Sequence, residues 1–213
     1  MTRRLCYSMI ARILVLLLAS VAAGPVAQPA DYAFTVYGAY RDGGSFTEAG
    51  TGKSLDIEGS GAAALSLDLP LDASRQVQIF VSRQSSNLGL EQSAAAPSVG
   101  SQLPITVTYL HIGGTNFFNG RIGQGPYVVG GLGVTLFDLR LSGSELEIRP
   151  SLNLGIGYQV LLGESVALRF EARGYATLVN SSGGLFCSGG CVVSIKGETV
   201  TQGEALLGLS FRF

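Results

Sequence analysis

The sequence predicts an all-β protein in which eight amphipathic strands form an antiparallel, up-and-down barrel. Three observations favour this fold class. Apolar and polar residues alternate along successive segments, and a period of two places each kind on its own face of a strand. The chain of 213 residues holds 30 glycines, which suit tight turns and strongly bent sheets. Connections between the segments alternate between long and short, which is typical of a barrel with loops at one end and turns at the other.

The composition narrows the class of function. The 14 basic and 15 acidic residues leave no excess charge of the kind that nucleic acids or acidic substrates attract. Charged residues make up only 14% of the chain, against about 25% in soluble proteins. With no tryptophan, one histidine and two methionines, the chain offers little for metal or redox chemistry. We therefore expect no cofactor and no nucleic-acid partner.

The N-terminus has the design of a helical secretory signal peptide. Arg3, Arg4 and Arg12 provide a basic region, and Ile13–Ala23 is a run of apolar or small residues. This run is shorter than the ~20 residues that a membrane-spanning helix needs. We expect a signal peptide at residues 1–23, with cleavage possible as far as residue 30, and the barrel domain at residues 31–213.

The alternation predicts eight strands and sets their order. It is clearest between Leu55 and Leu69, where leucines oppose acidic residues and serines, and clear again in the last segment, which ends at an aromatic C-terminus. Glycine-rich or polar stretches separate the segments. The expected strands are Tyr32–Arg41, Leu55–Leu69, Gln76–Gln84, Leu103–Ile112, Pro126–Phe137, Ser151–Val160, Val166–Arg173 and Gly203–Phe213.

The connections follow the expected odd and even pattern. Odd-numbered strands are followed by loops at Asp42–Lys53, Ser85–Gln102, Asp138–Glu145 and Leu178–Glu198. Even-numbered strands are followed by turns at Pro70–Ser74, Gly113–Gly125 and Gly163–Ser165. An even number of strands places both termini at the end that carries the turns, which in an outer-membrane barrel is the periplasmic end.

The fourth strand is ambiguous. Ile105, Val107 and Tyr109 share one parity, whereas Leu110 and Ile112 share the other. A bulge near Leu110 would bring both sets to one face. The sequence leaves this register open.

Alternation alone does not say which face points outward. The central positions of the oily faces carry no charge, and the segments reach ten or more residues, which suffices to cross a bilayer. Both features favour a transmembrane barrel with a polar interior; the alternative is a solvated, salt-bridged face of a soluble sheet. In a narrow barrel, buried charges must be paired. The residues expected to form an interstrand ion-pair network there are Asp56, Glu58, Arg169, Glu171, Arg173, Glu204 and Arg212.

The leader, the eight segments and the terminal Phe211-Arg212-Phe213 together resemble the small outer-membrane β-barrel proteins of Gram-negative bacteria, of the OmpA/OmpX/OmpW type. The stretches Y-L-H-I-G-G-T, G-G-L-G-V-T, L-R-F-E-A-R-G-Y and L-F-C-S-G-G-C are similar to a proteobacterial barrel group labelled as outer-membrane or porin-family. The resemblance implies an integral outer-membrane monomer that contacts lipid and lipopolysaccharide. It also implies that the barrel-assembly machinery reads Phe211 and Phe213 as an assembly signal.

Two cysteines remain in the mature chain once Cys6 leaves with the leader. Cys187 and Cys191 lie in C-S-G-G-C, where two glycines allow a very small disulfide loop in an oxidising compartment. The alternative, half of a metal site, lacks nearby partner ligands. We expect a disulfide.

Three functions remain open for such a barrel. The first is a non-enzymatic role in envelope structure or surface interaction, with extracellular loops and an interior filled by side chains. The second is a conduit for small hydrophobic solutes through a lateral opening. The third is a lipid A-modifying enzyme, which would need a serine next to His111, the only histidine. The expected topology places His111 toward the periplasmic end of its strand. Ser151 or Ser210 could face the interior, but the sequence places neither next to His111.

Overall fold

A computed structural model describes residues 32–47, 54–90, 102–119, 121–139, 146–179, 184–187, 191–194 and 199–213. The predicted signal peptide, residues 1–23, lies outside the described residues. Residues 31–213 form a compact unit of their own. No helix within the described ranges has the length and apolar character needed to cross a membrane.

Twelve strands occur in the described part of the chain, and every pairing between them is antiparallel. They are β1 (Ala33–Asp42), β2 (Ser45–Thr47), β3 (Ser54–Ile57), β4 (Ser60–Pro70), β5 (Arg75–Leu90), β6 (Gln102–Phe117), β7 (Gly125–Leu139), β8 (Glu147–Leu161), β9 (Val166–Leu178), β10 (Gly184–Cys187), β11 (Cys191–Ser194) and β12 (Thr199–Arg212).

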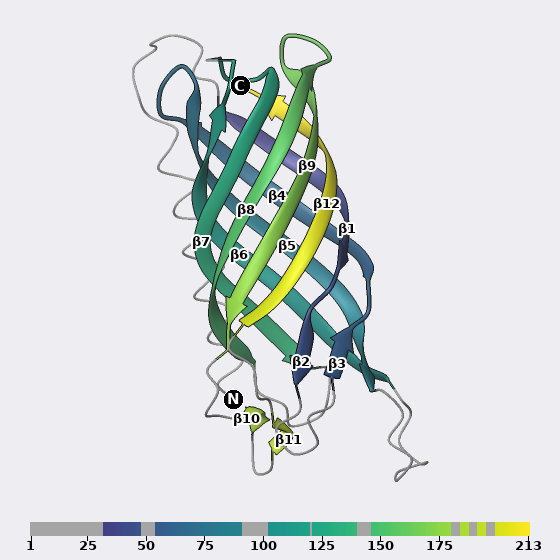
Figure 1. Cartoon of the computed structure of the whole chain (residues 1–213). Helices are drawn as coiled ribbons and strands as arrows, with labels where there is room; N and C mark the ends of the chain where they lie inside the picture. Colours follow the sequence, from purple (N-terminus) through teal and green to yellow (C-terminus); the bar gives the residue numbers. More distant parts are fainter. Residues whose placement is uncertain are drawn as a thin grey trace, which may run out of the picture. The chain divides into compact units, whose positions relative to one another are not determined.

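Eight long strands close the barrel in the order β1, β4, β5, β6, β7, β8, β9 and β12. The last strand, β12, returns to pair with β1 from Ala33↔Arg212 to Asp42↔Gly203. In Figure 1 the first strand, in purple, and the last, in yellow, therefore lie side by side. The predicted fold class, an eight-stranded antiparallel barrel, is confirmed.

The closure is completed at the chain terminus. The backbone N–H of Phe213 donates to the carbonyl oxygen of Tyr32 at 3.0 Å, and the two aromatic rings stack with centroids 6.2 Å apart. The N–H of Arg212 donates to Ser165 in the neighbouring turn at 2.8 Å. The C-terminal end of β12 is thus bound to the strands on both sides.

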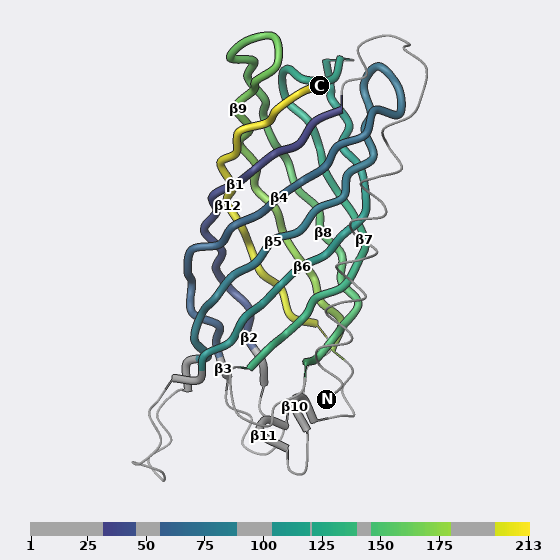
Figure 2. The backbone as a smooth tube through the Cα atoms, turned by 180° about the vertical axis from the view of Figure 1, so that it is seen from behind, coloured from purple at the N-terminus to yellow at the C-terminus, as the bar shows by residue number. Residues whose placement is uncertain are grey.

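The connections between the barrel strands lie alternately at its two ends, and Figures 1 and 2 show the β4–β5, β6–β7 and β8–β9 turns together at one end. The turns occupy residues 71–74, 118–124 and 162–165. In the first, the Asp72 carboxylate accepts the backbone N–H groups of Ser74 and Arg75 at 2.9 and 2.8 Å, which fixes the reversal. In the second, Gly123 and Gly125 adopt φ values of 99° and 96°, which side chains disfavour. We refer below to the turn end and the loop end.

The barrel wall separates two kinds of side chain. Along β12 the odd-numbered residues are exposed and the even-numbered ones, as far as Ser210, are buried, so Leu207 and Leu209 face outward while Glu204 faces inward. The same alternation continues around the barrel. Large exposed apolar side chains on the outer face include Phe34, Val36, Leu65, Ile79, Leu110, Ile112, Leu132, Leu154, Ile156, Phe170, Leu207, Leu209 and Phe211.

The predicted second strand is interrupted. β3 ends at Ile57 and β4 begins at Ser60, and the intervening residues reverse the parity: Ile57 is buried, whereas Leu65 is exposed. The interruption allows β3 to pair with β2 and with the end of β5. Consequently Asp56 and Glu58 are exposed rather than directed into the barrel, contrary to the predicted ion-pair network.

Two further expectations about strands are corrected. The loop predicted from Ser85 begins later, because β5 continues to Leu90 with the inward Leu88 buried against other apolar residues. In β6 the pairing with β7 runs without interruption from Ile105 to Phe117, so the bulge suggested near Leu110 is not needed. Leu110 faces outward, and Ile105, Val107 and Tyr109 face inward, where they are fully buried.

Candidate functional site: the polar interior of the barrel

The barrel interior holds apolar side chains at both ends and charged ones between. At the loop end, a buried cluster includes Ile57, Leu88, Ile105, Phe137, Leu139, Val179 and Val200. At the turn end, a smaller cluster consists of Phe117, Ile122, Tyr127 and Val129. The charged side chains between them form two groups, which we call the turn-half cluster and the loop-half cluster.

The turn-half cluster is built around two arginines of β9. Arg169 Nη1 lies 2.7 Å from Asp68 Oδ2, and its Nη2 lies 3.1 Å from Glu171 Oε1. Arg173 Nε donates to Glu171 Oε2 at 2.7 Å. Glu171 therefore joins both guanidinium groups, since its two oxygens each meet one of them.

Neutral side chains complete the turn-half cluster. The hydroxyls of Tyr37 and Tyr127 both donate to Glu171 Oε1 at 2.7 Å. Gln78 donates to Asp68 Oδ1 at 2.7 Å and accepts from Arg173 Nη2 at 2.8 Å. These residues come from strands β1, β4, β5, β7 and β9, so the cluster ties opposite walls of the barrel together.

The loop-half cluster is built around Arg41 of β1 and Glu204 of β12. Arg41 Nη2 lies 3.0 Å from Glu204 Oε1, and neither side chain is exposed. Ser82 donates to the same carboxylate oxygen at 2.7 Å, and Tyr175 donates to the other oxygen. The Arg41 guanidinium lies over the Tyr109 ring, 4.6 Å from its centroid.

The charges of the two clusters balance. Three buried arginines, Arg41, Arg169 and Arg173, face three buried carboxylates, Asp68, Glu171 and Glu204. Removing one member of a buried pair costs far more than an exposed pair contributes, because the remaining charge stays desolvated. The interior is therefore a neutral assembly whose members depend on one another.

The predicted network residues divide into three groups. Arg169, Glu171, Arg173 and Glu204 lie inside the barrel and carry the contacts above. Arg212 is half-buried at the turn end, beside Gly123. Asp56 and Glu58 are exposed near the loop end. Sequence reasoning missed Arg41 and Asp68, although both share the parity of polar residues on their strands, which was the available signal.

His111 lies inside the barrel, on β6. Its Nε2 is 2.9 Å from Ser151 Oγ. Its ring stacks with those of Tyr109 and Tyr175, with centroids 5.5 and 5.9 Å away. The sequence could not place these two residues together, because β6 and β8 are separated by β7 and only the register brings them level.

The His111–Ser151 pair does not form a complete nucleophilic site. A base that activates serine is itself oriented by a third group, yet His111 Nδ1 has no hydrogen-bond partner among the described residues. Both side chains are also buried behind the wall, which keeps a bilayer lipid away from them. Within the described ranges, no three histidine, cysteine or acidic residues are grouped as metal ligands.

Comparisons with known proteins place the fold. No protein-family model and no curated protein matches the sequence. Among solved structures, Neisserial surface protein A is 15% identical, with a TM-score of 0.53, over 85% of this chain and 97% of that one. The outer-membrane protein AlkL, determined in DMPC lipid bilayers, is 17% identical, with a TM-score of 0.52, over 90% of this chain and 94% of that one. The chain thus has the fold of the small, eight-stranded outer-membrane barrels.

Proposed function

We propose that the protein is a non-enzymatic integral barrel of the bacterial outer membrane, with a role in envelope structure or surface interaction. One observation carries the proposal: the outer face is apolar, and the charges that a water-soluble barrel would expose are buried inside. In lipid, the oily face must point outward and polar residues inward. Leu132, Leu154 and Ile156 are 68%, 68% and 65% exposed on the outer face, which would be unfavourable in water.

The strand lengths support the same location. The eight barrel strands contain between 10 and 16 residues, whereas tilted strands of ~9–11 residues already cross a bilayer. The longest strands extend past the apolar belt at the loop end, where Arg83 and Ser85 of β5 are exposed on the outer face. This extra length is suited to presenting the connections away from the membrane.

The packed interior argues against an open aqueous pore. Both charged clusters span the interior, and the apolar clusters occupy its two ends. An eight-stranded barrel encloses only enough space for such side chains. The alternative, a lateral conduit for hydrophobic solutes, would require neighbouring strands to part, yet they are paired over most of their length.

Two measurements test this proposal. A folded barrel in an outer-membrane fraction should migrate differently on a gel before and after boiling, and the purified barrel should give no large, steady conductance in planar bilayers. A protein that fractionates with the soluble periplasm and shows no heat-dependent shift would refute the membrane location. Steady single-channel currents would refute the closed interior.

We also propose the orientation and the assembly signal. The turn end, where β1 begins and β12 ends, faces the periplasm, and the loop end faces outside, where it meets lipopolysaccharide. Phe211 and Phe213 serve as the signal for the barrel-assembly machinery; both side chains are exposed, at 44% and 70%. The barrel acts as a monomer, since the eight strands close on themselves and leave no unpaired edge.

We further propose a disulfide between Cys187 and Cys191. These residues are direct Cα partners in the antiparallel β10–β11 pair. Directly opposed residues have Cα atoms ~4.5–5.5 Å apart, within the range that a disulfide spans. The unreduced, unfolded mature protein should therefore resist alkylation by a maleimide and take up two labels after reduction. Two labels without reductant would exclude the bond.

A further inference from the structure

The outer wall of the barrel contains a groove near the turn end, between β5, β6 and β7. Its volume is about 340 Å³. The floor is bare because Gly114 of β6 and Gly130 of β7 stand opposite each other in the register, at positions where neighbouring even-numbered residues point outward. Val77, Val128 and Leu154 border this floor. The groove is thus a hollow in the apolar outer face, at a place where no side chain covers the backbone.

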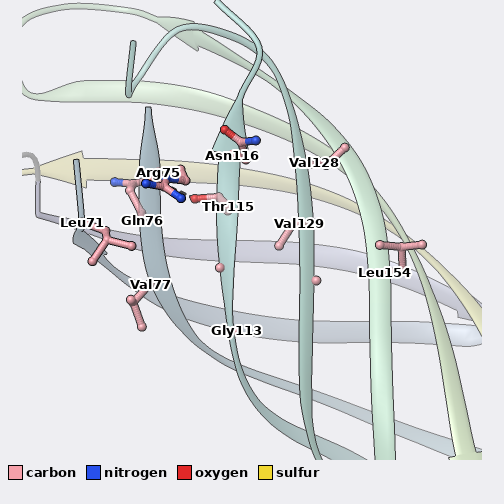
Figure 3. A pocket seen from close by; sticks show the side chains of 12 residues that line it. Leu71, Arg75, Gln76, Val77, Gly113, Thr115, Asn116, Val128, Val129 and Leu154 are labelled. Carbon is pink, nitrogen blue, oxygen red and sulfur yellow. Dashed lines mark hydrogen bonds between the residues drawn. The ribbon is translucent and has the colours of Figure 1, made fainter. Parts of the chain in front are cut away.

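The lining changes character across the groove. Figure 3 shows Arg75 and Asn116 on the side of the groove formed by β5 and β6, and Val128 and Leu154 on the opposite side. The two polar residues lie next to the turns, because β5 begins and β6 ends there. A ligand that fits this lining has a polar head at the membrane surface and an apolar tail directed toward the membrane interior.

We propose that this groove binds one ethanolamine glycerophospholipid of the turn-side leaflet. One acyl chain lies over Gly114 and Gly130, and the headgroup meets the turn that joins β4 to β5. This inference rests on the proposed membrane location, since only there is the groove surrounded by lipid.

The charges on the turn favour this headgroup. Arg75 Nη2 lies 2.5 Å from Asp72 Oδ2, and the two side chains remain 59% and 37% exposed. The pair offers a guanidinium to a phosphate and a carboxylate to an ammonium group. A zwitterionic phosphoethanolamine complements both charges, whereas an anionic phosphoglycerol headgroup complements only the arginine.

Two glycine variants provide a matched test. In Gly130→Leu, the new Cβ would lie 3.4 Å from the Asn153 carbonyl oxygen and 3.5 Å from Leu154 Cδ1, so the side chain is accommodated while it fills the groove. In Gly61→Leu, the new Cβ has no atom within 4 Å and adds the same leucine to the outer face of β4, away from the groove. Both variants keep the barrel apolar outside.

The measurement is native mass spectrometry of the full barrel, released from bilayers that contain equal amounts of ethanolamine and glycerol phospholipids. We expect the wild type and Gly61→Leu to retain one ethanolamine phospholipid. Gly130→Leu should reduce the retained fraction about tenfold, the change expected when roughly two methylene groups lose their burial. Asp72→Asn should remove the preference for the ethanolamine headgroup, because the Asp72 carboxylate is the group that meets the ammonium, whereas Arg75 meets the phosphate of either lipid.

Three outcomes would overturn the proposal: no lipid retained by the wild type, equal retention in the two glycine variants, or a wild-type preference for the glycerol headgroup. A dimer in place of a lipid adduct would show instead that a second copy covers the groove. These outcomes are separable from failure of the membrane location, because a barrel that lacks only the lipid site still shifts on boiling and inserts into vesicles.

Discussion

At the scale of single residues, Glu171 is the group on which the turn-half cluster depends. Its oxygens meet Arg169 and Arg173 and accept hydrogen bonds from Tyr37 and Tyr127. Glu171→Gln keeps the shape but leaves two buried arginines with Asp68 as their only carboxylate within the cluster. We expect the free energy of unfolding to fall by about 3–5 kcal/mol, the usual cost of breaking a buried pair.

Urea titration of the folded fraction in lipid vesicles, followed by the gel shift, measures this loss. Glu164→Gln is the matched control, because Glu164 is exposed in the turn between β8 and β9, and such surface changes stay within ~0.5 kcal/mol. Equal midpoints for the two variants would mean that the cluster does not stabilise the barrel.

Asp72, unlike the buried Glu171, forms its ion pair at the surface of the protein. Its side-chain hydrogen bond with Arg75, and next the backbone N–H of Ser74, lower the pKa of the Asp72 carboxyl from 3.8 to about 2. A lowered pKa in the folded state means that the carboxylate stabilises the fold above pH 3.8, and that this contribution is lost as the pH falls through about 2. Because the carboxyl is exposed, solvent screening keeps the effect small.

Asp72→Asn should therefore lower the urea midpoint slightly at pH 7, and the difference from the wild type should shrink as the pH falls from 4 to 2. The same titration in high salt should reduce the difference at pH 7, since exposed pairs are screened. A difference between the two proteins that grows on acidification would contradict the assigned role of this turn.

At the scale of the strand, β7 offers two positions on the same outer face with different expected surroundings. Leu132 lies within the apolar belt and is 68% exposed, whereas Asp138 lies near the loop end of the strand. Leu132→Arg should lower the free energy of unfolding in vesicles by up to about 2–4 kcal/mol, the cost of an arginine near the bilayer midplane. Asp138→Arg should change it little. In a barrel surrounded by water, Leu132→Arg would be neutral or favourable, which would refute the membrane location.

Within single strands, the alternation of apolar and polar residues predicts some side-chain orientations and not others. Parity is local, and in β12 it separates the two faces without interruption: Leu207 and Leu209 point outward and Glu204 points inward. The parity of Asp56 and Glu58 was misread, because the break at residues 58–59 reverses the parity between β4 and the short β3, and both strands pair with β5. In β6, apolar residues occupy both faces, and only pairing with two neighbours shows that Tyr109 points inward.

Contacts across the interior could not be predicted in this way. Arg41 and Glu204 are 163 residues apart and meet because β1 and β12 pair in one particular register. His111 and Ser151 likewise meet through the stagger of three strands. Alternation predicts whether a side chain points inward or outward, but not its position along the barrel axis. That position depends on the strand register and determines which charged side chains meet.

At the scale of the whole molecule, the closed and neutral interior leaves the two ends as the places where the protein can meet other molecules. The turn end is short and well ordered by Asp72, Gly123 and the Phe213–Tyr32 closure. The loop end carries the connections at residues 43–59, 91–101, 140–146 and 179–198, three of which are longer than any turn at the opposite end. A surface role therefore requires the loop end to face outside.

Short epitope insertions test this orientation in intact cells. If the turn end faces the periplasm, as proposed, an epitope in the 91–101 connection should be labelled by an antibody added to whole cells. The same epitope in the 162–165 turn should be labelled only after the outer membrane is permeabilised. Both variants must first show the heat-dependent gel shift, so that labelling reports on folded barrels. Labelling of the turn epitope, but not of the loop epitope, in intact cells would reverse the proposed orientation and remove the surface role with it.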